Sequence, residues 1–296
     1  MAIRARNLCV AALLHPMPSF SQSWFLIDIL QCVTYQYTTA KIRPAQHAIG
    51  NSFTTLKQSH RLLPAARNAS AGQGGMTDGQ WALQLTDLCK TYDEPAVDHL
   101  TLNIRRGELY ALLGPNGAGK TTTLKMDTGL LQPDSGDITV SGIDALARPI
   151  DAKRVMAWLP DEPLIYDKLS PLEYLEFVAG LWGIAADVAD KRAHDLVALL
   201  GLEAKAGERC QGLSKGMRQK VALAGALIHE PDLIILDEPL TGLDAGSARQ
   251  VKAVLREHVA RGVTIVMTTH ILDVAERMAD RIGVIAQGRL VSEGTL

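Results

Sequence analysis

The chain has 296 residues, of which 47% are hydrophobic and 21% are charged, as in an ordinary globular protein with one large domain or two smaller ones. Its formal net charge of −2 is uneven, because residues 1–75 contain seven basic residues and one acid, while the remainder contains 23 basic and 31 acidic residues. This acidic main body argues against nucleic acid as the principal partner, since DNA and RNA binding usually requires a basic surface.

Residues 1–75 differ in composition from everything that follows. They are poor in acids, rich in Ser, Thr, Gln and Ala, and show no sustained helix or strand period. A transit peptide would explain the basic character but would be unusually long, and a secretory signal fits poorly because its apolar run, residues 8–14, is short. We favour a third interpretation, in which translation starts at Met76. In all three cases we expect residues 1–75 to be an extension with little stable structure.

The cysteines and the apolar runs restrict the class of protein further. Cys9, Cys32, Cys89 and Cys210 are scattered, with no CxxC pair and no histidine at metal-ligand spacing, so free thiols are expected. No stretch approaches the ~20 apolar residues of a membrane-spanning helix. If the protein works at a membrane, another chain must supply the membrane part.

From Met76 onward the pattern predicts strands and helices in alternation. Residues 83–85 and 100–104 alternate apolar and polar side chains, as half-buried antiparallel strands do. Continuous apolar runs, typical of strands buried on both faces, occupy residues 109–113, 233–236 and 263–267. Residues 282–285 and 289–291 predict a closing hairpin around Gln287-Gly288.

Residues 161–212 lack any strand pattern. A helix is predicted over Pro171–Leu181, because Ser170 precedes it, proline occupies its first position and Glu173 completes a capping box. A second helix is predicted over Asp187–Leu200, where apolar residues recur at helical spacing up to Gly201. We expect residues 161–212 to form a helical subdomain inserted into an α/β core.

Residues 114–121, Gly-Pro-Asn-Gly-Ala-Gly-Lys-Thr, match the phosphate-binding pattern GxxxxGK[ST] in full. They follow a buried strand and precede a helical stretch, residues 122–128, which is the context that the pattern requires. The glycines let backbone N–H groups converge on phosphate oxygens, and the helix start adds its positive dipole end. Lys120 would reach the β- and γ-phosphates, and the hydroxyl of Thr121 is a hard oxygen ligand for Mg²⁺.

The strand over residues 233–236 ends in two acids, Asp237 and Glu238. Ligands bind at the carboxyl ends of strands in α/β sheets, so Asp237 would stand where it can hold Mg²⁺ through water. Glu238 is the right group to orient or deprotonate an attacking water.

Leu213-Ser-Lys-Gly-Met217, upstream of this strand, resembles the LSGGQ signature of ATP-binding cassette (ABC) proteins. Other elements similar to that family follow the same order: Tyr92 matches the aromatic that stacks on adenine, residues 242–244 match the D-loop and His270 matches the switch histidine. The resemblance covers residues 80–295 and is specific, because six elements agree in order and spacing. With LSKGM and Leu-Pro-Asp-Glu-Pro at 159–163, the chain is most similar to single-cassette ATPases that pair with multidrug- or sodium-exporting permeases.

The resemblance implies an ABC ATPase domain over residues 76–296, with a P-loop NTPase (RecA-like) α/β core, an antiparallel β-subdomain and the helical subdomain. It implies ATP and Mg²⁺ as cofactors, and head-to-tail pairing that places Ser214 and Gly216 on the ATP of a second cassette. The implied catalytic residues are Lys120, Glu238 and His270. The implied nucleotide-binding residues are Tyr92, Gly114, Pro115, Asn116, Gly117, Ala118, Gly119, Lys120, Thr121, Thr122, Ser214 and Gly216. The implied metal ligands are Thr121, Asp161 and Asp237.

The sequence departs from the family in three places. Asp161 stands where the family usually has the Q-loop glutamine, and its carboxylate can still reach Mg²⁺ or its water, so we expect altered coupling without loss of activity. Asp127 occupies a position that the family usually fills with a large apolar residue, so it must find a partner or the helix packs less well. The chain also stops soon after the closing hairpin, where family members usually continue with further helices.

The resulting functional hypothesis is the ATP-hydrolysing subunit of an exporter, peripheral at the cytoplasmic face of the inner or plasma membrane. Its expected partners are a separate transmembrane permease and a second cassette, identical or different, and no nucleic acid. The alternative is a soluble ABC ATPase acting on ribosome or DNA repair complexes, but such relatives typically carry two cassettes or a long coiled-coil insertion. A non-hydrolysing regulatory cassette is disfavoured by the presence of Glu238 and His270.

Overall fold

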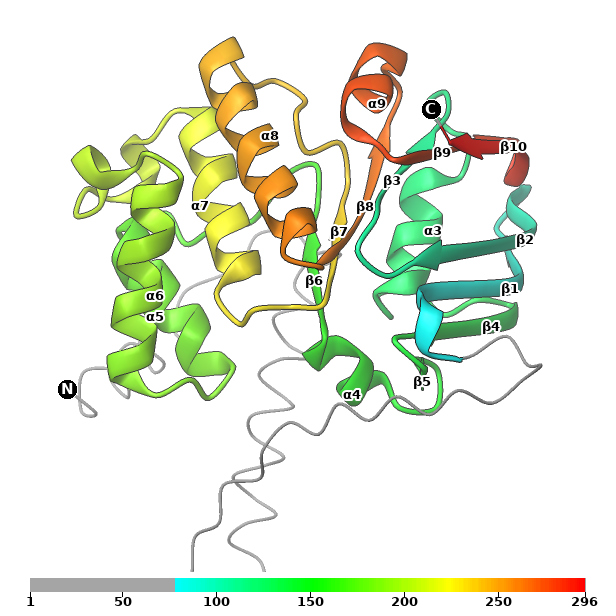
Figure 1. Cartoon of the computed structure of the whole chain (residues 1–296), viewed down its shortest axis with the longest axis horizontal. Helices are drawn as coiled ribbons and strands as arrows, with labels where there is room; N and C mark the ends of the chain where they lie inside the picture. Colours follow the sequence, from blue (N-terminus) through cyan, green and yellow to red (C-terminus); the bar gives the residue numbers. More distant parts are fainter. Residues whose placement is uncertain (1–77, 296) are drawn as a thin grey trace, which may run out of the picture.

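The computed structural model describes residues 78–295, which form two β-sheets flanked by helices (Figure 1). The predictions for residues 1–75 lie outside this range. The larger sheet has the order β10-β9-β3-β8-β7-β6, in which β10 runs antiparallel to β9 and the other neighbours are parallel. Its strands are β3 (Leu109–Leu113), β6 (Met156–Leu159), β7 (Leu233–Leu236), β8 (Thr264–Thr269), β9 (Arg281–Ala286) and β10 (Arg289–Thr295).

The smaller sheet is antiparallel and has the order β2-β1-β4-β5. Its strands are β1 (Trp81–Thr91), β2 (Pro95–Arg105), β4 (Ser135–Val140) and β5 (Ile143–Asp144). Helix α3 (Lys120–Asp127) lies between the two sheets (Figure 1). Its Leu124 and Met126 are fully buried in one apolar cluster with residues from both sheets.

Alternate residues of the parallel strands point to opposite faces of the sheet, and both faces are buried. In β3, Leu109 and Ala111 join the cluster under the helices that follow β6, whereas Tyr110 and Leu112 join the cluster around α3. This double burial is the reason why these strands read as continuous apolar runs in the sequence. The larger sheet therefore packs against a separate hydrophobic core on each of its two faces.

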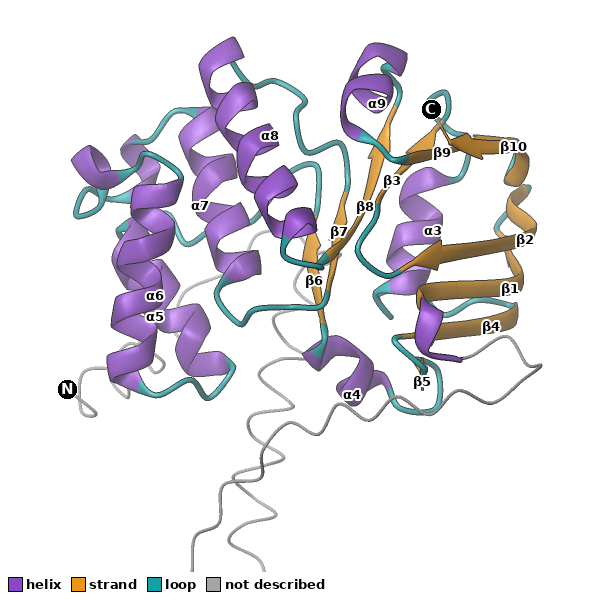
Figure 2. Cartoon of the chain, in the orientation of Figure 1, coloured by secondary structure: helices purple, strands orange, loops and turns teal. Residues whose placement is uncertain are grey.

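The remaining helices are α4 (Pro149–Arg154), α5 (Pro171–Leu181), α6 (Ala186–Leu199), α7 (Lys215–Leu227), α8 (Ala245–Ala260) and α9 (Leu272–Met278). Short 3-10 turns occupy Asp78–Gln80, Glu203–Lys205 and Cys210–Gly212. Helices α5 to α8 lie on the side of the larger sheet away from α3 (Figure 2). Within residues 78–295, no helix combines the length and the apolar character that a membrane span requires.

The predicted fold class, an α/β core with an antiparallel sheet and helices inserted between β6 and β7, is confirmed. The capping box that opens α5 is present: Ser170 Oγ accepts the N–H of Glu173 at 3.3 Å, and the Glu173 carboxylate accepts the N–H of Ser170 at 2.9 Å. The closing hairpin of β9 and β10 is also present.

Several elements were not predicted, and some boundaries were wrong. Strands β4, β5 and β6 are short, and half of β4 is polar, so they carry little strand signal. Helix α3 begins at Lys120, two residues before the predicted stretch, because the glycines of the phosphate loop lead directly into its first turn. Helices α4, α8 and α9 were also missed, although Asp244 caps α8 by accepting the N–H of Ser247 at 2.9 Å.

Asp127, at the end of α3, is buried with 1% of its surface exposed. Its Oδ1 atom has no hydrogen-bond partner within the described residues, and whether the helix packs less well stays a prediction. Burial raises the pKa of this carboxyl well above its usual range. The fold therefore favours the neutral form of this group.

We predict that Asp127→Asn becomes progressively more stable than the parent protein as pH rises from 4 to 7. The unfolded chain releases this proton near pH 4 and the folded chain retains it, so the parent loses about 1.4 kcal/mol per pH unit between the two pKa values. Urea unfolding at several pH values measures the difference. The exposed Asp137→Asn is the control, and a pH-independent difference for Asp127→Asn would contradict the prediction.

Candidate active site

The carboxyl ends of β3, β7 and β8 lie side by side, because β8 pairs with both of the other strands in parallel. The phosphate loop follows β3, the two acids follow β7 and the switch histidine follows β8. Ligands bind at this edge of an open parallel sheet. Topology alone thus gathers residues that are more than one hundred positions apart in the sequence.

The phosphate loop, residues 114–121, owes its course to its glycines. A side chain at Gly114 would place its Cβ 2.4 Å from the carbonyl oxygen of Ile285, and one at Gly119 would meet the carbonyl oxygen of Ala96 at 2.3 Å. Gly119 also has a φ of 102°, a conformation that side chains rarely allow. The backbone therefore approaches β2 and β9 as no other residue type would permit.

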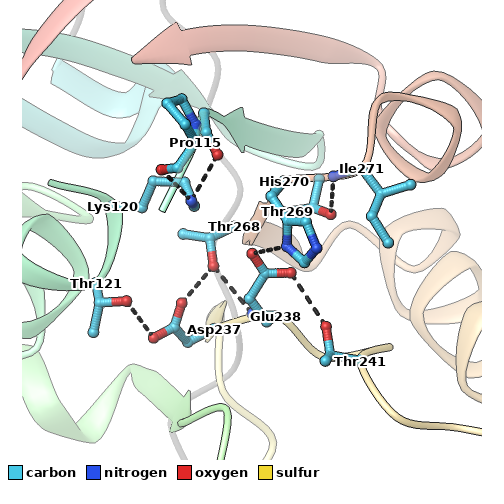
Figure 3. Close-up of polar contacts among 11 residues, drawn as sticks. Pro115, Lys120, Thr121, Asp237, Glu238, Thr241, Thr268, Thr269, His270 and Ile271 are labelled. Carbon is cyan, nitrogen blue, oxygen red and sulfur yellow. Dashed lines mark hydrogen bonds and ion pairs between the residues drawn. The ribbon is translucent and has the colours of Figure 1, made fainter. Parts of the chain in front are cut away.

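Lys120 is 7% exposed and turns back onto this loop (Figure 3). Its ammonium group donates to the carbonyl oxygens of Gly114 at 2.7 Å and Pro115 at 3.0 Å. These contacts hold the cation over the ring of backbone N–H groups that the loop and the first turn of α3 present. The loop can accept a phosphate group and neutralise part of its charge.

Asp237 is the buried centre of a hydroxyl–carboxylate chain (Figure 3). The hydroxyl of Thr121 donates to Asp237 Oδ2 at 2.8 Å, and the hydroxyl of Thr268 donates to Oδ1 at 2.5 Å. The same Thr268 oxygen accepts the N–H of Glu238 at 3.0 Å. One carboxylate thereby joins α3, β7 and β8.

Glu238 follows Asp237 in a left-handed conformation, with a φ of 46°. Such a conformation is uncommon for residues other than glycine and is often found at functional sites. It turns the carboxylate toward β8, where Oε1 lies 2.9 Å from Nδ1 of His270 and Oε2 accepts the hydroxyl of Thr241 at 3.3 Å. The Glu238 side chain is only 13% exposed, whereas that of His270 is 41% exposed, so the pair forms the solvent side of the site.

The predicted metal ligands meet the chemical requirements of Mg²⁺. Asp161, just after β6, is close enough to Asp237 that the charge of Asp237 adds to partial burial in raising the pKa of Asp161. A divalent cation would relieve this repulsion, and Thr121 adds a neutral hard oxygen. No cluster of three or more His, Cys, Asp or Glu side chains that could hold a metal ion is found among residues 78–295.

Ser214 and Gly216 lie elsewhere, at the start of α7. Ser214 Oγ accepts the N–H of Met217 at 3.3 Å and so caps α7. A Cβ at Gly216 would lie 3.3 Å from the hydroxyl of Ser247, so this turn packs against the start of α8 and not against the phosphate loop. Tyr92 is 60% exposed in the turn between β1 and β2, with the ammonium group of Lys90 5.9 Å from its ring centre.

Three hydroxyls of the site were missed by sequence reasoning. Thr268 supports both acids, Thr241 donates to Glu238, and Thr269 accepts the N–H of Ile271 at 3.1 Å. The available signal was the pair Thr268-Thr269 before His270, since two hydroxyls at the end of an otherwise apolar strand indicate a polar neighbour.

Comparisons with known proteins agree with this geometry. A family profile described as "ABC transporter" matches residues 97–241. The chain is 36% identical over 220 residues to the probable multidrug ABC transporter ATP-binding protein YbhF of Escherichia coli (strain K12). The match covers 74% of this chain and 38% of YbhF. It is 37% identical over 212 residues to the SkfA peptide export ATP-binding protein SkfE of Bacillus subtilis (strain 168), with 71% and 88% covered.

Among solved structures, the chain is similar to the dimeric structure of a post-hydrolysis state of the ATP-binding cassette MJ0796 bound to ADP and Pi. The TM-score is 0.67 at 26% identity, and the match covers 72% of this chain and 98% of the other. The chain thus spans well under half of the Escherichia coli relative but nearly all of this cassette.

We predict that Thr268→Val destabilises the fold by about 1–3 kcal/mol, because it removes the hydroxyl that donates to Oδ1 of the buried Asp237 and accepts the N–H of Glu238. Denaturant unfolding measures the loss. Thr268→Ser keeps the hydroxyl and is the matched control, expected to retain most of the stability. Equal losses for the two variants would mean that packing of the methyl group, and not the hydroxyl, stabilises this site.

Proposed function

Because this chain belongs to the ABC transporter family, we propose that it is the ATP-binding and ATP-hydrolysing subunit of an exporter whose membrane part is a separate permease chain. The observation that carries the proposal is the continuous contact from Thr121 through Asp237 and Thr268 to Glu238 and His270. This contact places the hydroxyl of Thr121, the buried Asp237 and the more exposed Glu238 next to one another beside the phosphate loop.

In this proposal the phosphate loop binds the triphosphate of ATP. Backbone N–H groups at Gly117 and Gly119, and the start of α3, would face the phosphate oxygens. Lys120 would exchange its two carbonyl contacts for the β- and γ-phosphates, a small rearrangement because its ammonium group already lies at the loop. The exposed ring of Tyr92 is available to stack on adenine.

Glu238 and His270 would perform the hydrolytic step. The Glu238 carboxylate can accept a proton from, or orient, a water that attacks the γ-phosphate, and His270 at 2.9 Å can hold that water and the phosphate in register. Thr121, Asp161 and Asp237 are the oxygen groups for Mg²⁺, which when bound neutralises phosphate charge. Phosphoryl transfer depends mainly on such positioning and charge neutralisation.

The signature residues would act on the ATP of a second cassette. Helix α7 lies on one side of the larger sheet and α3 on the other (Figure 1). The signature segment that begins α7 and the phosphate loop that precedes α3 are therefore separate within one subunit. Head-to-tail pairing would bring Ser214 and Gly216 of one subunit to the phosphates held by the other. The dimeric state of the similar MJ0796 cassette supports this arrangement.

The functions for which these relatives are named favour export over the soluble alternative. YbhF is described as a probable multidrug transporter protein, and SkfE as a peptide export protein. By extension, we place this subunit at the cytoplasmic face of the membrane, peripherally bound to its permease. The relatives favour no ribosomal or DNA repair role.

Lys120→Ala is expected to abolish MgATP binding, because it removes the only side-chain cation of the phosphate loop. Isothermal titration calorimetry on the purified chain checks this. Lys125→Ala, on the exposed side of the same helix, is the control and should bind as the parent does. Undiminished affinity in Lys120→Ala would refute the role of the loop.

Glu238→Gln is expected to retain MgATP binding and to lose nearly all hydrolysis, because the amide has nearly the shape of the carboxylate but cannot take a proton. Phosphate release per subunit, measured beside calorimetric affinity, separates the two effects. Glu257→Gln, on the surface of α8, should hydrolyse at the parent rate. Unchanged turnover in Glu238→Gln would remove Glu238 as the base.

A further inference from the structure

Arg218, in the second turn of α7, bridges two segments that the proposed mechanism treats separately. One guanidinium nitrogen, Nη1, forms an ion pair with Asp167, in the loop that follows Asp161. The same nitrogen donates to the carbonyl oxygen of Cys210 at 3.2 Å, just before the signature segment. Arg218 also donates its backbone N–H to the carbonyl oxygen of Ser214 at 2.9 Å. One residue therefore contacts Ser214 itself, the turn leading into it and a distant loop.

Backbone hydrogen bonds reinforce the same junction. The N–H of Gln211 donates to the carbonyl oxygen of Asp167 at 3.0 Å, and the N–H of Cys210 donates to that of Leu169 at 2.8 Å. Cys210 itself is fully buried, so this turn is anchored in the core. Beyond it, Gly212, Ser214 and Lys215 are exposed, whereas Leu213 and Gly216 are buried. The start of α7 thus exposes Ser214 to solvent, and Arg218 connects it to the turn that is anchored in the core.

We propose that the Asp167–Arg218 ion pair is a positioning element that aims Ser214 at the ATP of the partner subunit. The inference rests on the proposed function, because it requires head-to-tail pairing. Although Asp167 follows Asp161 by only six residues, it serves the opposite ATP site from the one that Asp161 serves. Neither residue touches nucleotide: the pair acts through the direction of the first turn of α7.

Neither Asp167 nor Arg218 is among the charged groups that act on Asp161, although Lys215, in the first turn of α7, is one of them. We therefore expect loss of the pair to affect dimer formation far more than MgATP binding in its own subunit.

A purely structural role makes a different prediction. The Asp167 and Arg218 side chains are 57% and 30% exposed, and exposed ion pairs contribute little to stability. If the pair served only the fold, its removal would change neither nucleotide affinity nor pairing of subunits to a measurable degree. A positioning role instead predicts that removal of the pair weakens MgATP-dependent dimer formation, the step that requires Ser214 to be correctly placed.

The test uses the hydrolysis-deficient Glu238→Gln protein, so that bound MgATP persists. Two quantities are measured: MgATP affinity of the dilute, monomeric chain by displacement of a fluorescent ATP analogue, and the dimer dissociation constant in saturating MgATP by light scattering. Adding Arg218→Gln is expected to weaken dimer formation by about tenfold or more, since small misplacements of positioning groups have large effects. MgATP affinity of the monomer should stay within about twofold, because the sites are separate.

Asp167→Asn provides the second variant and should weaken dimer formation in the same direction. The double variant should be no weaker than Arg218→Gln alone, because both changes remove one interaction. Arg256→Gln is the matched control: Arg256 also pairs with an aspartate, Asp280, at 3.4 Å and donates to a backbone carbonyl, that of Arg277, at 3.2 Å. It should leave dimer formation unchanged.

Four results would overturn the proposal or its premises. If the Arg218→Gln monomer binds MgATP more weakly, the Asp167–Arg218 pair serves the ATP site of its own subunit. Unchanged dimer formation in both Arg218→Gln and Asp167→Asn would leave the pair without a positioning role. A Glu238→Gln protein that binds MgATP but stays monomeric would refute the head-to-tail premise, and one that binds no MgATP would refute the proposed function itself.

Discussion

The interaction on which the site depends is the pair of hydroxyl hydrogen bonds to the buried carboxylate of Asp237. A buried carboxylate is costly unless donors satisfy it, and here Thr121 and Thr268 donate to its two oxygens. These donors come from α3 and β8, so the carboxylate ties the phosphate loop and the switch-histidine strand to β7. The backbone of Glu238 is fixed by the same hydroxyl of Thr268. The phosphate loop and the acid proposed to act in hydrolysis are thereby fixed relative to each other.

A second constraint comes from the larger sheet, which is buried on both faces. Because consecutive strand residues point to opposite faces, the helices that cover the sheet must divide between its two sides. The phosphate loop begins the helix on one side, and the signature segment begins a helix on the other. A single subunit with this topology holds the two halves of the proposed site in separate places. In the proposed function a second cassette brings them together.

Asp127 and Asp161 show how the same residue type has different consequences in different surroundings. Asp127 lies in an apolar core, where its Oδ1 finds no donor within the described residues, and its cost falls on stability. Asp161 lies at the edge of the sheet beside another acid, where the repulsion between them favours a cation. The depth of burial therefore decides whether an aspartate in this fold lies in a core or at the edge where a ligand is proposed to bind.

The sequence by itself determined the strongly periodic elements, the phosphate loop and the acids after β7, because strand and helix periods and contiguous motifs are local properties. It also indicated the capping residue Ser170. Tertiary structure alone decided that Thr268 supports Asp237, that Arg218 meets Asp167, and that β6 belongs to the sheet. These facts depend on strand order and on contacts between distant segments, which no local pattern encodes. Asp127 falls between the two: its position marked it as unusual, and only packing showed that it lacks a donor for Oδ1.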